Sequence, residues 1–172
     1  MMNHVADKEL QTGVTLVELL IVIAIAAILA SLAGPSFTDF INRTRQNSVV
    51  SQLVSDLNRA RSEAIKRNTP VLLCERDTDT ACANTKNWQS GWLVCVDADV
   101  DKQCDPGTVI NPNPLVVHAA LPTTLTLVGD VSKVKFRPNG SSGFGAVTLT
   151  AGGTGLADKI VRISVTGNIS RP

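Results

Sequence analysis

The sequence predicts an α+β protein in which one long N-terminal helix packs against an antiparallel β-sheet. An apolar run covers residues 14–34, and a helical repeat of apolar side chains continues from it to about residue 68. Short β-type runs separated by turn residues fill residues 69–172, which we call the head. Because helix and strands occupy separate parts of the chain, an α+β arrangement is expected. A length of 172 residues, 44% of them hydrophobic, suits one such helix and one modest globular domain.

The chain begins with a short polar leader, residues 1–13, which ends in a glycine. The apolar run that follows, VTLVELLIVIAIAAILASLAG, carries a single charge. At ~1.5 Å per residue this run forms a helix ~30 Å long, the thickness of a bilayer core. We therefore expect residues 14–34 to be a transmembrane or assembly segment. Cleavage as an ordinary secretory signal is the alternative, because small residues at 27–33 offer candidate cleavage sites.

Glu18 is the one charged residue inside this apolar run, which contains no Lys or Arg to pair with it. A carboxylate in such a helix is costly unless it is paired, so it is a candidate functional residue. Cleavage after Gly13 would create a new α-amino group on Val14, four residues earlier. We expect Glu18 to pair with that amine on a neighbouring subunit. The alternative is a tolerated charge at the membrane edge.

The segment GVTLVELL, residues 13–20, resembles the class III signal of type IV pilins and pseudopilins. The resemblance implies that prepilin peptidase cuts after Gly13 and methylates Val14. It also implies that Glu18, with Thr15 beside it in the motif, guides assembly. The chain departs from the family pattern at Val14, where phenylalanine is usual. The implied location is the inner membrane, crossed once with the head in the periplasm, and then the assembled pilus.

Beyond the apolar run the helical repeat continues to residue 68. Pro35 stands where the same family commonly has a helix-kinking proline, and its missing N–H should bend the helix without ending the pattern. Asn68-Thr69-Pro70 should stop the helix. Apolar residues recur at steps of three and four, which predicts an amphipathic helix: Phe37, Phe40, Ile41, Val49, Val50, Leu53, Val54, Leu57, Ala60, Ala64 and Ile65.

Short β-type runs follow in the head, separated by turn residues such as Asp105-Pro106-Gly107, Pro138-Asn139-Gly140 and Gly152-Gly153. Clean alternation in two of the runs is typical of half-buried antiparallel strands. The predicted strands are Val71–Glu75, Gly91–Asp97, Val109–Ile110 with Leu115–His118, Leu125–Val128, Lys133–Arg137, Ala146–Thr150 and Ile160–Thr166.

Four cysteines, Cys74, Cys82, Cys95 and Cys104, lie in the first half of the head. They include no C-x-x-C pair and no intervening histidine, which argues against a zinc site. An even number beside an export signal predicts two disulfides, with four buried thiols as the alternative. We favour Cys74–Cys82 and Cys95–Cys104, because each would tie a polar loop to the strand beside it. Cys74–Cys95 is the main rival pairing.

The head extends the resemblance to the GspH/FimT group, which comprises FimT- and FimU-type minor pilins and H-type minor pseudopilins of type II secretion. The matching stretches are ARSEAIKR at 60–67, VLLC at 71–74, Trp88 and GWLV at 91–94. The resemblance implies a non-catalytic minor pilin that primes pilus assembly or lies at the tip. Its implied partners are prepilin peptidase and other minor and major pilins, contacted through the N-terminal helix and the head. A pseudopilin of type II secretion is an alternative function.

A second alternative is a DNA-binding minor pilin, because FimT-type members carry a C-terminal Gly-Arg-x-Arg motif. Here the corresponding stretch is GNISR at 167–171, in which neither arginine position matches. Arg162 and Arg171, with Lys159, are candidate DNA contacts, but a phosphate grip needs several cations. A net charge of +1 adds no argument for nucleic acid, so DNA binding is not favoured.

No catalytic residue or cofactor site is predicted. The only histidines are His4, in the leader, and His118, and no nucleophile–base, Walker or HExxH motif is present. Asp97, Asp99 and Asp101 resemble the start of a calcium loop, but Lys102 replaces the turn glycine and residue 108 is not glutamate. We therefore expect an acidic turn and no metal. Trp88 and Trp92 are expected to pack inside the head.

Overall fold

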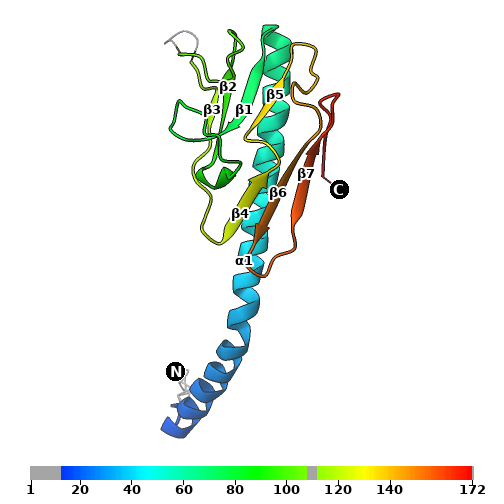
Figure 1. The fold of residues 1–172 in the computed structure, drawn as a ribbon. Helices are drawn as coiled ribbons and strands as arrows, with labels where there is room; N and C mark the ends of the chain where they lie inside the picture. Colours follow the sequence, from blue (N-terminus) through cyan, green and yellow to red (C-terminus); the bar gives the residue numbers. More distant parts are fainter. Residues whose placement is uncertain (1–12, 108–111, 172) are drawn as a thin grey trace, which may run out of the picture. The chain divides into compact units, whose positions relative to one another are not determined.

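The computed structural model describes residues 13–107 and 112–171, apart from the side chains of residues 30–36. It divides into two compact units, Met1–Thr38 and Asp39–Pro172. One helix, α1 (Leu16–Arg67), contributes to both units and is followed by all of the strands (Figure 1). The predicted fold class, one long helix with antiparallel β-structure, is confirmed.

The first unit is the N-terminal part of α1. Its apolar side chains are exposed throughout the described range, from 75% for Leu16 to 50% for Leu20. Within the part of the chain that the structure describes, no helix has an apolar stretch of the length needed to cross a membrane. The side chains of residues 30–34, which belong to the predicted segment 14–34, lie outside the described ones, and so does the side chain of Pro35. The backbone is helical through Pro35, as the continuing pattern predicted.

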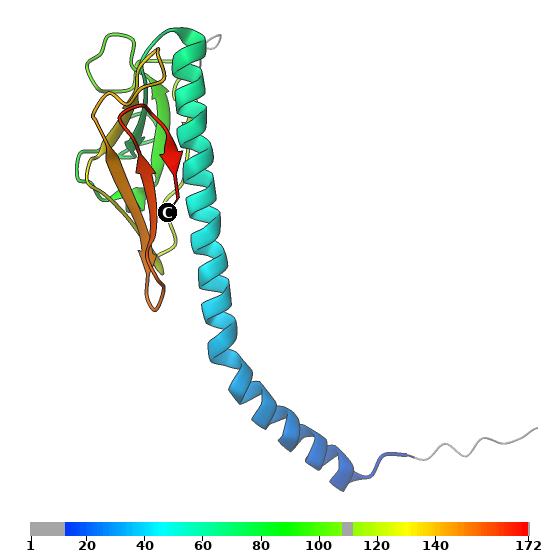
Figure 2. The same ribbon diagram turned by 90° about the vertical axis from the view of Figure 1, so that its right-hand side faces the viewer.

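The second unit joins the rest of α1 to the head. Figure 2 shows the strands on one side of this part of the helix. The contact face of the helix has the predicted spacing of three and four. Ile65 and Phe40 were predicted on this face but are 52% and 65% exposed. The helix residues that are buried against the sheets are Val49, Val50, Leu53, Leu57, Ala60 and Ala64.

In the described ranges 13–107 and 112–171 the strands form two four-stranded sheets instead of the single sheet predicted. All strand pairs are antiparallel. The first sheet has the order β3-β2-β1-β5 and consists of β1 (Val71–Glu75), β2 (Trp92–Val96), β3 (Val116–Val117) and β5 (Lys133–Phe136). The second has the order β4-β6-β7-β8 and consists of β4 (Leu125–Gly129), β6 (Val147–Gly153), β7 (Lys159–Ile163) and β8 (Ile169–Ser170).

Several strand limits differ from the prediction. Gly152 and Gly153, predicted as a turn, lie inside β6 and pair with Thr126 and Leu125 of β4. The last predicted strand, Ile160–Thr166, extends too far, since β7 ends at Ile163, and the short β8 was not predicted. The predicted strand Val109–Ile110 falls outside the described residues. A 3₁₀ turn, η1 (Trp88–Ser90), precedes β2.

Both tryptophans are fully buried, which confirms their predicted packing role. The indole N–H of Trp92 donates a hydrogen bond to Asp56 Oδ2 of α1 at 2.9 Å, and that of Trp88 donates to the Val131 carbonyl at 3.0 Å. Each ring therefore packs in the core while its indole N–H group makes a hydrogen bond. The core lies between α1 and the inner faces of both sheets.

Candidate functional site

The start of α1 is fixed by the sequence motif that was predicted to direct assembly. The Thr15 hydroxyl accepts a hydrogen bond from the Glu18 backbone N–H at 3.2 Å, and the first helical bond runs from Leu19 N to Thr15 O at 3.1 Å. Thr15 is thus the N-cap residue, and Thr-x-x-Glu is the sequence of a capping box. This local role for Thr15 was not foreseen from the sequence.

Glu18 lies in the first turn of α1, where the helix dipole favours a negative charge. Its side chain is exposed, and so is Val14, which is 71% exposed. Both groups are therefore open to a neighbouring chain. Gly13 has open space around the position of a Cβ atom, so this chain itself does not require glycine there.

The two predicted disulfides are present. Cys74 is bonded to Cys82 and Cys95 to Cys104, with Cα–Cα distances of 5.7 and 5.4 Å. The rival pairing Cys74–Cys95 and the alternative of four thiols are both excluded. Each bond ties a polar loop to the strand that precedes it: residues 76–87 to β1, and residues 97–107 to β2.

Glu75, at the end of β1, holds the first of these loops, which sequence reasoning missed. Its side chain is 2% exposed. The carboxylate accepts hydrogen bonds from the backbone N–H groups of Thr85 and Lys86, both at 2.9 Å, and from the Thr85 hydroxyl. A buried carboxylate is stable when backbone donors surround it in this way. No pattern in the sequence separates Glu75 from the other acids of the head.

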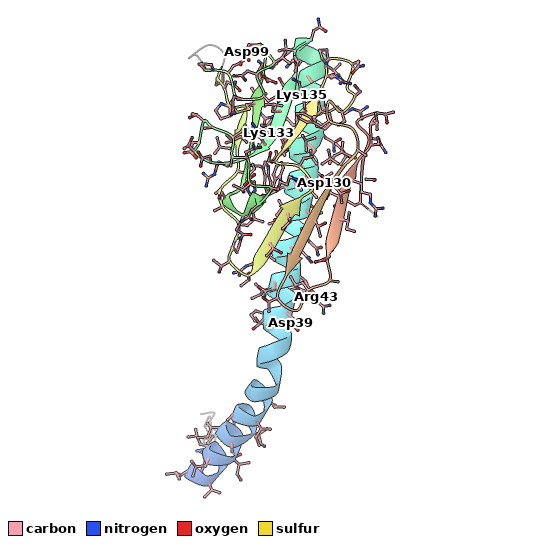
Figure 3. The ribbon with its side chains drawn as sticks, in the orientation of Figure 1. Asp39, Arg43, Asp99, Asp130, Lys133 and Lys135 are labelled. Atoms are coloured by element: carbon pink, nitrogen blue, oxygen red, sulfur yellow. A yellow bond between two sulfur atoms is a disulfide. The ribbon has the colours of Figure 1, made fainter. Side chains whose placement is uncertain are left out.

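The acidic loop contains a buried ion pair. Asp97 is fully buried, and its Oδ2 lies 3.1 Å from the Lys135 ammonium nitrogen. Its Oδ1 accepts a hydrogen bond from the Lys102 N–H at 3.1 Å. The carboxylates of Asp97, Asp99 and Asp105 lie within 4.8 Å of one another, and Figure 3 shows Asp99 and Lys135 at this end of the head. Lys135 thus places a positive charge beside one of these three carboxylates.

The candidate DNA contacts are divided between two faces of the second sheet. Lys159 and Arg171 line a hollow of about 420 Å³ between α1 and the β7–β8 edge. Lys159 donates a hydrogen bond to Asn47 Oδ1, and Arg171 donates to Ser51 Oγ at 3.4 Å. Arg162 alternates with the buried Val161 and Ile163 of β7 and therefore points away from α1.

A third basic residue lies next to this hollow, but it does not extend Lys159 and Arg171 into a row that could contact successive DNA phosphates. Arg43, labelled in Figure 3, lines a neighbouring hollow of about 320 Å³ that also includes Lys159. Asp158 reduces the positive charge of the first hollow. The structure therefore brings together Lys159, Arg171 and Arg43 and separates Arg162 from them. This division does not give a continuous row of cations.

His118 joins the first sheet to α1. Its ring stacks on Trp92 with centroids 3.8 Å apart, and its Nε2 lies 2.7 Å from Gln52 Oε1. Its Nδ1 lies 3.0 Å from the Ala119 carbonyl. Both ring nitrogens are occupied by these packing contacts, so the geometry gives His118 a structural role.

Comparison with protein families gives two matches on this chain. Residues 49–167 match the family described as Type II transport protein GspH. Residues 10–34 match the prokaryotic N-terminal methylation motif. The two matches cover the head with the adjoining part of α1, and the junction around Gly13.

Curated relatives match part of the chain. A type IV major alpha-pilin of Moraxella bovis is 38% identical over 68 residues, which are 40% of this chain and 43% of that protein. The pilin-like protein PilA1 of Thermus thermophilus is 36% identical over 95 residues, 55% of this chain and 54% of that protein. The chain thus spans about half or less of the length of these relatives.

Among solved structures, the type IV minor pilin FimU of Pseudomonas aeruginosa has the same fold. One crystal form gives a TM-score of 0.58 at 21% identity, covering 77% of this chain and 92% of that one. A second crystal form gives a TM-score of 0.55 over 73% of this chain. At this identity the likeness shows the fold alone.

Proposed function

The chain belongs to the GspH family, and we propose that it is a minor pilin, a non-catalytic subunit that primes assembly of a type IV pilus or lies at its tip. The observation that carries this proposal is the N-terminal segment. It combines a methylation motif, a capped helix start and a row of exposed apolar side chains. Helices that pack together in a filament need such a segment, because the exposed apolar side chains become buried between neighbouring helices.

Assembly begins, in this proposal, with removal of residues 1–13 by prepilin peptidase and methylation of Val14. Until then the chain waits in the inner membrane, crossing it once with the head in the periplasm. The two disulfides support an oxidising compartment for the head. Joining a filament buries the exposed apolar residues of α1 against neighbouring helices, which is favourable because apolar surface leaves water or lipid for close packing.

Glu18 sets the register of this packing by pairing with the Val14 amine of a neighbouring subunit. Glu18 and Val14, whose amine cleavage would free, are four residues apart in the chain, and both residues are exposed. Once helices surround them, an unpaired charge becomes costly, and only an alignment that joins the two groups removes that cost. The pairing therefore selects one alignment among many apolar contacts.

The proposal is tested by replacing Glu18 with alanine in the full chain and measuring the amount in sheared filaments. We expect the variant to stay in the membrane fraction while its filament content falls at least about tenfold, the effect of ~1.4 kcal/mol. Asp39→Ala is the matched control, because it removes an exposed carboxylate from the same helix. Equal incorporation of Glu18→Ala and the control would refute the role of Glu18, and a wild-type chain absent from filaments would refute the proposed function.

A role as a minor pseudopilin is the second candidate, favoured by the description of the matched family as a type II transport protein. The two functions differ in what a deletion removes. Loss of a minor pilin lowers the number of surface pili, whereas loss of a pseudopilin stops release of exoproteins and leaves pili unchanged. Counting pili and assaying secreted protein in one deletion strain separates them.

A further inference from the structure

The two disulfides lie side by side on the outer face of the first sheet. Strands β1 and β2 are antiparallel neighbours, with Leu72 opposite Cys95 and Cys74 opposite Leu93. These four side chains share one face and are all fully buried, and the partly buried Cys82 and Cys104 pack over them. The outer face of the sheet thus has its own small core, made of two leucines and four sulfur atoms.

The sulfur atoms of the two bonds touch each other. Cys82 Sγ lies 3.7 Å from Cys104 Sγ, and all four sulfur atoms lie within 4.8 Å of one another. Cys74 and Cys95, on the strands, are 0% exposed, whereas Cys82 and Cys104, on the loops, are partly exposed. The loop cysteines are therefore the more accessible ends of the two bonds.

We propose that the four cysteines form one thiol–disulfide exchange site, which a dithiol reductant enters at Cys82. A reductant thiolate attacks Cys82 Sγ, forms a mixed disulfide and releases Cys74 as a thiolate, which takes up a proton. The second thiol of the reductant then attacks the reductant sulfur that is bonded to Cys82. The reductant leaves as an intramolecular disulfide, and Cys82 is freed as a thiolate. Two electrons have passed from the reductant to the Cys74–Cys82 bond.

The exchange step follows within the protein. The Cys82 thiolate attacks Cys104 Sγ, the sulfur it already contacts, and displaces Cys95. A Cys82–Cys104 bond forms as the Cys95–Cys104 bond breaks, and the Cys95 thiolate takes up a proton. No further oxidant or reductant is needed, because one disulfide and two thiols exist before and after the step. By symmetry, entry at Cys104 leads to the same Cys82–Cys104 bond with Cys74 displaced.

The exchange changes which segments of the chain the remaining disulfide links. In the starting structure each loop is tied to its own strand, and after exchange the two loops are tied to each other across the sheet. The free thiols then sit at the two fully buried positions, where a neutral cysteine packs as a small apolar side chain. Leu72 and Leu93 stay covered although one covalent bond has been lost.

The test uses Cys74→Ser and Cys95→Ser in the full chain, each of which leaves three cysteines and one thiol. The purified variants are held near pH 8, quenched with an alkylating agent, and mapped by non-reducing peptide mass spectrometry. In both variants we expect a gain of the Cys82–Cys104 peptide, with a matching loss of the original bridge. The double variant Cys74→Ser/Cys82→Ser is the control, because it retains Cys95–Cys104 with no thiol to attack it.

Two further measurements keep the test decisive. Fluorescence of the two buried tryptophans reports whether each variant is folded, and an unfolded variant is replaced by wild-type protein treated with a limiting amount of dithiothreitol. Exchange in urea provides the comparison for an unordered chain. Retention of Cys95–Cys104 alone in Cys74→Ser, or equal amounts of Cys82–Cys95 and Cys82–Cys104 under native conditions, would overturn the proposal.

Discussion

Replacing Lys135 with methionine should destabilise the head strongly, because it leaves a charge buried without a partner. The Lys135 ammonium lies 3.1 Å from the carboxylate of Asp97, and the side chains are 10% and 0% exposed. Methionine keeps most of the apolar stem that packs against Gly143, where a Cβ atom would lie 2.9 Å from Lys135 Cγ. The substitution therefore removes the charge with little change in packing.

The magnitude follows from the burial of the pair. Breaking a buried ion pair by removing one partner costs about 3–5 kcal/mol, since the remaining charge has lost both water and its partner. Among the described residues, the Asp97 carboxylate then retains only the hydrogen bond from the Lys102 N–H. With a urea dependence of about 1–3 kcal/mol per molar, the unfolding midpoint should fall by at least about 1 M.

Tryptophan fluorescence is the assay, because the chain has two tryptophans and both are buried in the head. Urea titrations of the mature chain in detergent then follow the head alone. Lys133→Met is the matched control, since Lys133 belongs to the same strand and donates its bond to the Lys102 carbonyl instead of a buried carboxylate. We expect the control to lose less than about 1 kcal/mol.

A double variant separates charge from packing. In Asp97→Asn/Lys135→Met no net charge stays buried, so we expect it to be more stable than Lys135→Met alone by at least about 1 kcal/mol. A loss below about 1 kcal/mol in Lys135→Met, or a double variant less stable than the single one, would refute the reasoning.

Two further predictions concern the backbone and the helix end. Gly91 has φ +89°, and a Cβ atom there would lie 2.1 Å from the His118 carbonyl oxygen, so Gly91→Ala should cost more than about 2 kcal/mol in the same urea titration; wild-type stability would contradict this contact. The hydrogen bond from Arg67 Nε to Glu63 Oε2, 2.5 Å long, lowers the pKa of Glu63, and Arg67→Ala should raise that pKa in an NMR titration. A lowered carboxyl pKa stabilises the folded state at pH values above the unfolded pKa, and this contribution is lost as the pH falls through the folded pKa. Arg67→Ala lacks this contribution at every pH, so on acidification its free energy of unfolding should fall slightly less than that of the wild-type chain. An unchanged Glu63 titration would exclude Arg67 as the cause.

Local patterns in the sequence were sufficient for the helix and the disulfides. The three- and four-residue spacing from Val49 to Ala64 identified the face of α1 that is buried. Loop chemistry beside two predicted strands favoured Cys74–Cys82 and Cys95–Cys104 over pairing across the strands. Both features depend on residues that are close in the chain, where spacing determines geometry.

Features that depend on distant pairing were not predictable in the same way. An alternating strand has the same pattern in one sheet or in two, so the division into two sheets appeared only in the structure. Asp97 follows β2, and Lys135 belongs to β5. The two residues come close together because β2 and β5 flank β1 in the first sheet, which depends on the strand order. Ile65 continues the helical repeat, yet it is 52% exposed, although Ala64 beside it is fully buried in the core.

Some features of the candidate sites could likewise be predicted from the sequence, and others needed the structure. The motif at residues 13–20 was recognisable from its order of residues, and the match to the methylation motif confirms the resemblance. The N-cap role of Thr15 needed backbone geometry. The separation of Arg162 from Lys159 and Arg171 needed the alternation of β7, which the sequence alone did not place relative to α1.

The central claim, that the chain is a processed filament subunit, is tested most directly by the intact mass of the chain recovered from sheared filaments. The proposal predicts a chain that begins at Val14, carries one added methyl group, and shifts by four hydrogens on reduction of its two disulfides. A chain that retains residues 1–13, or one that is never found in the filament fraction, would contradict it.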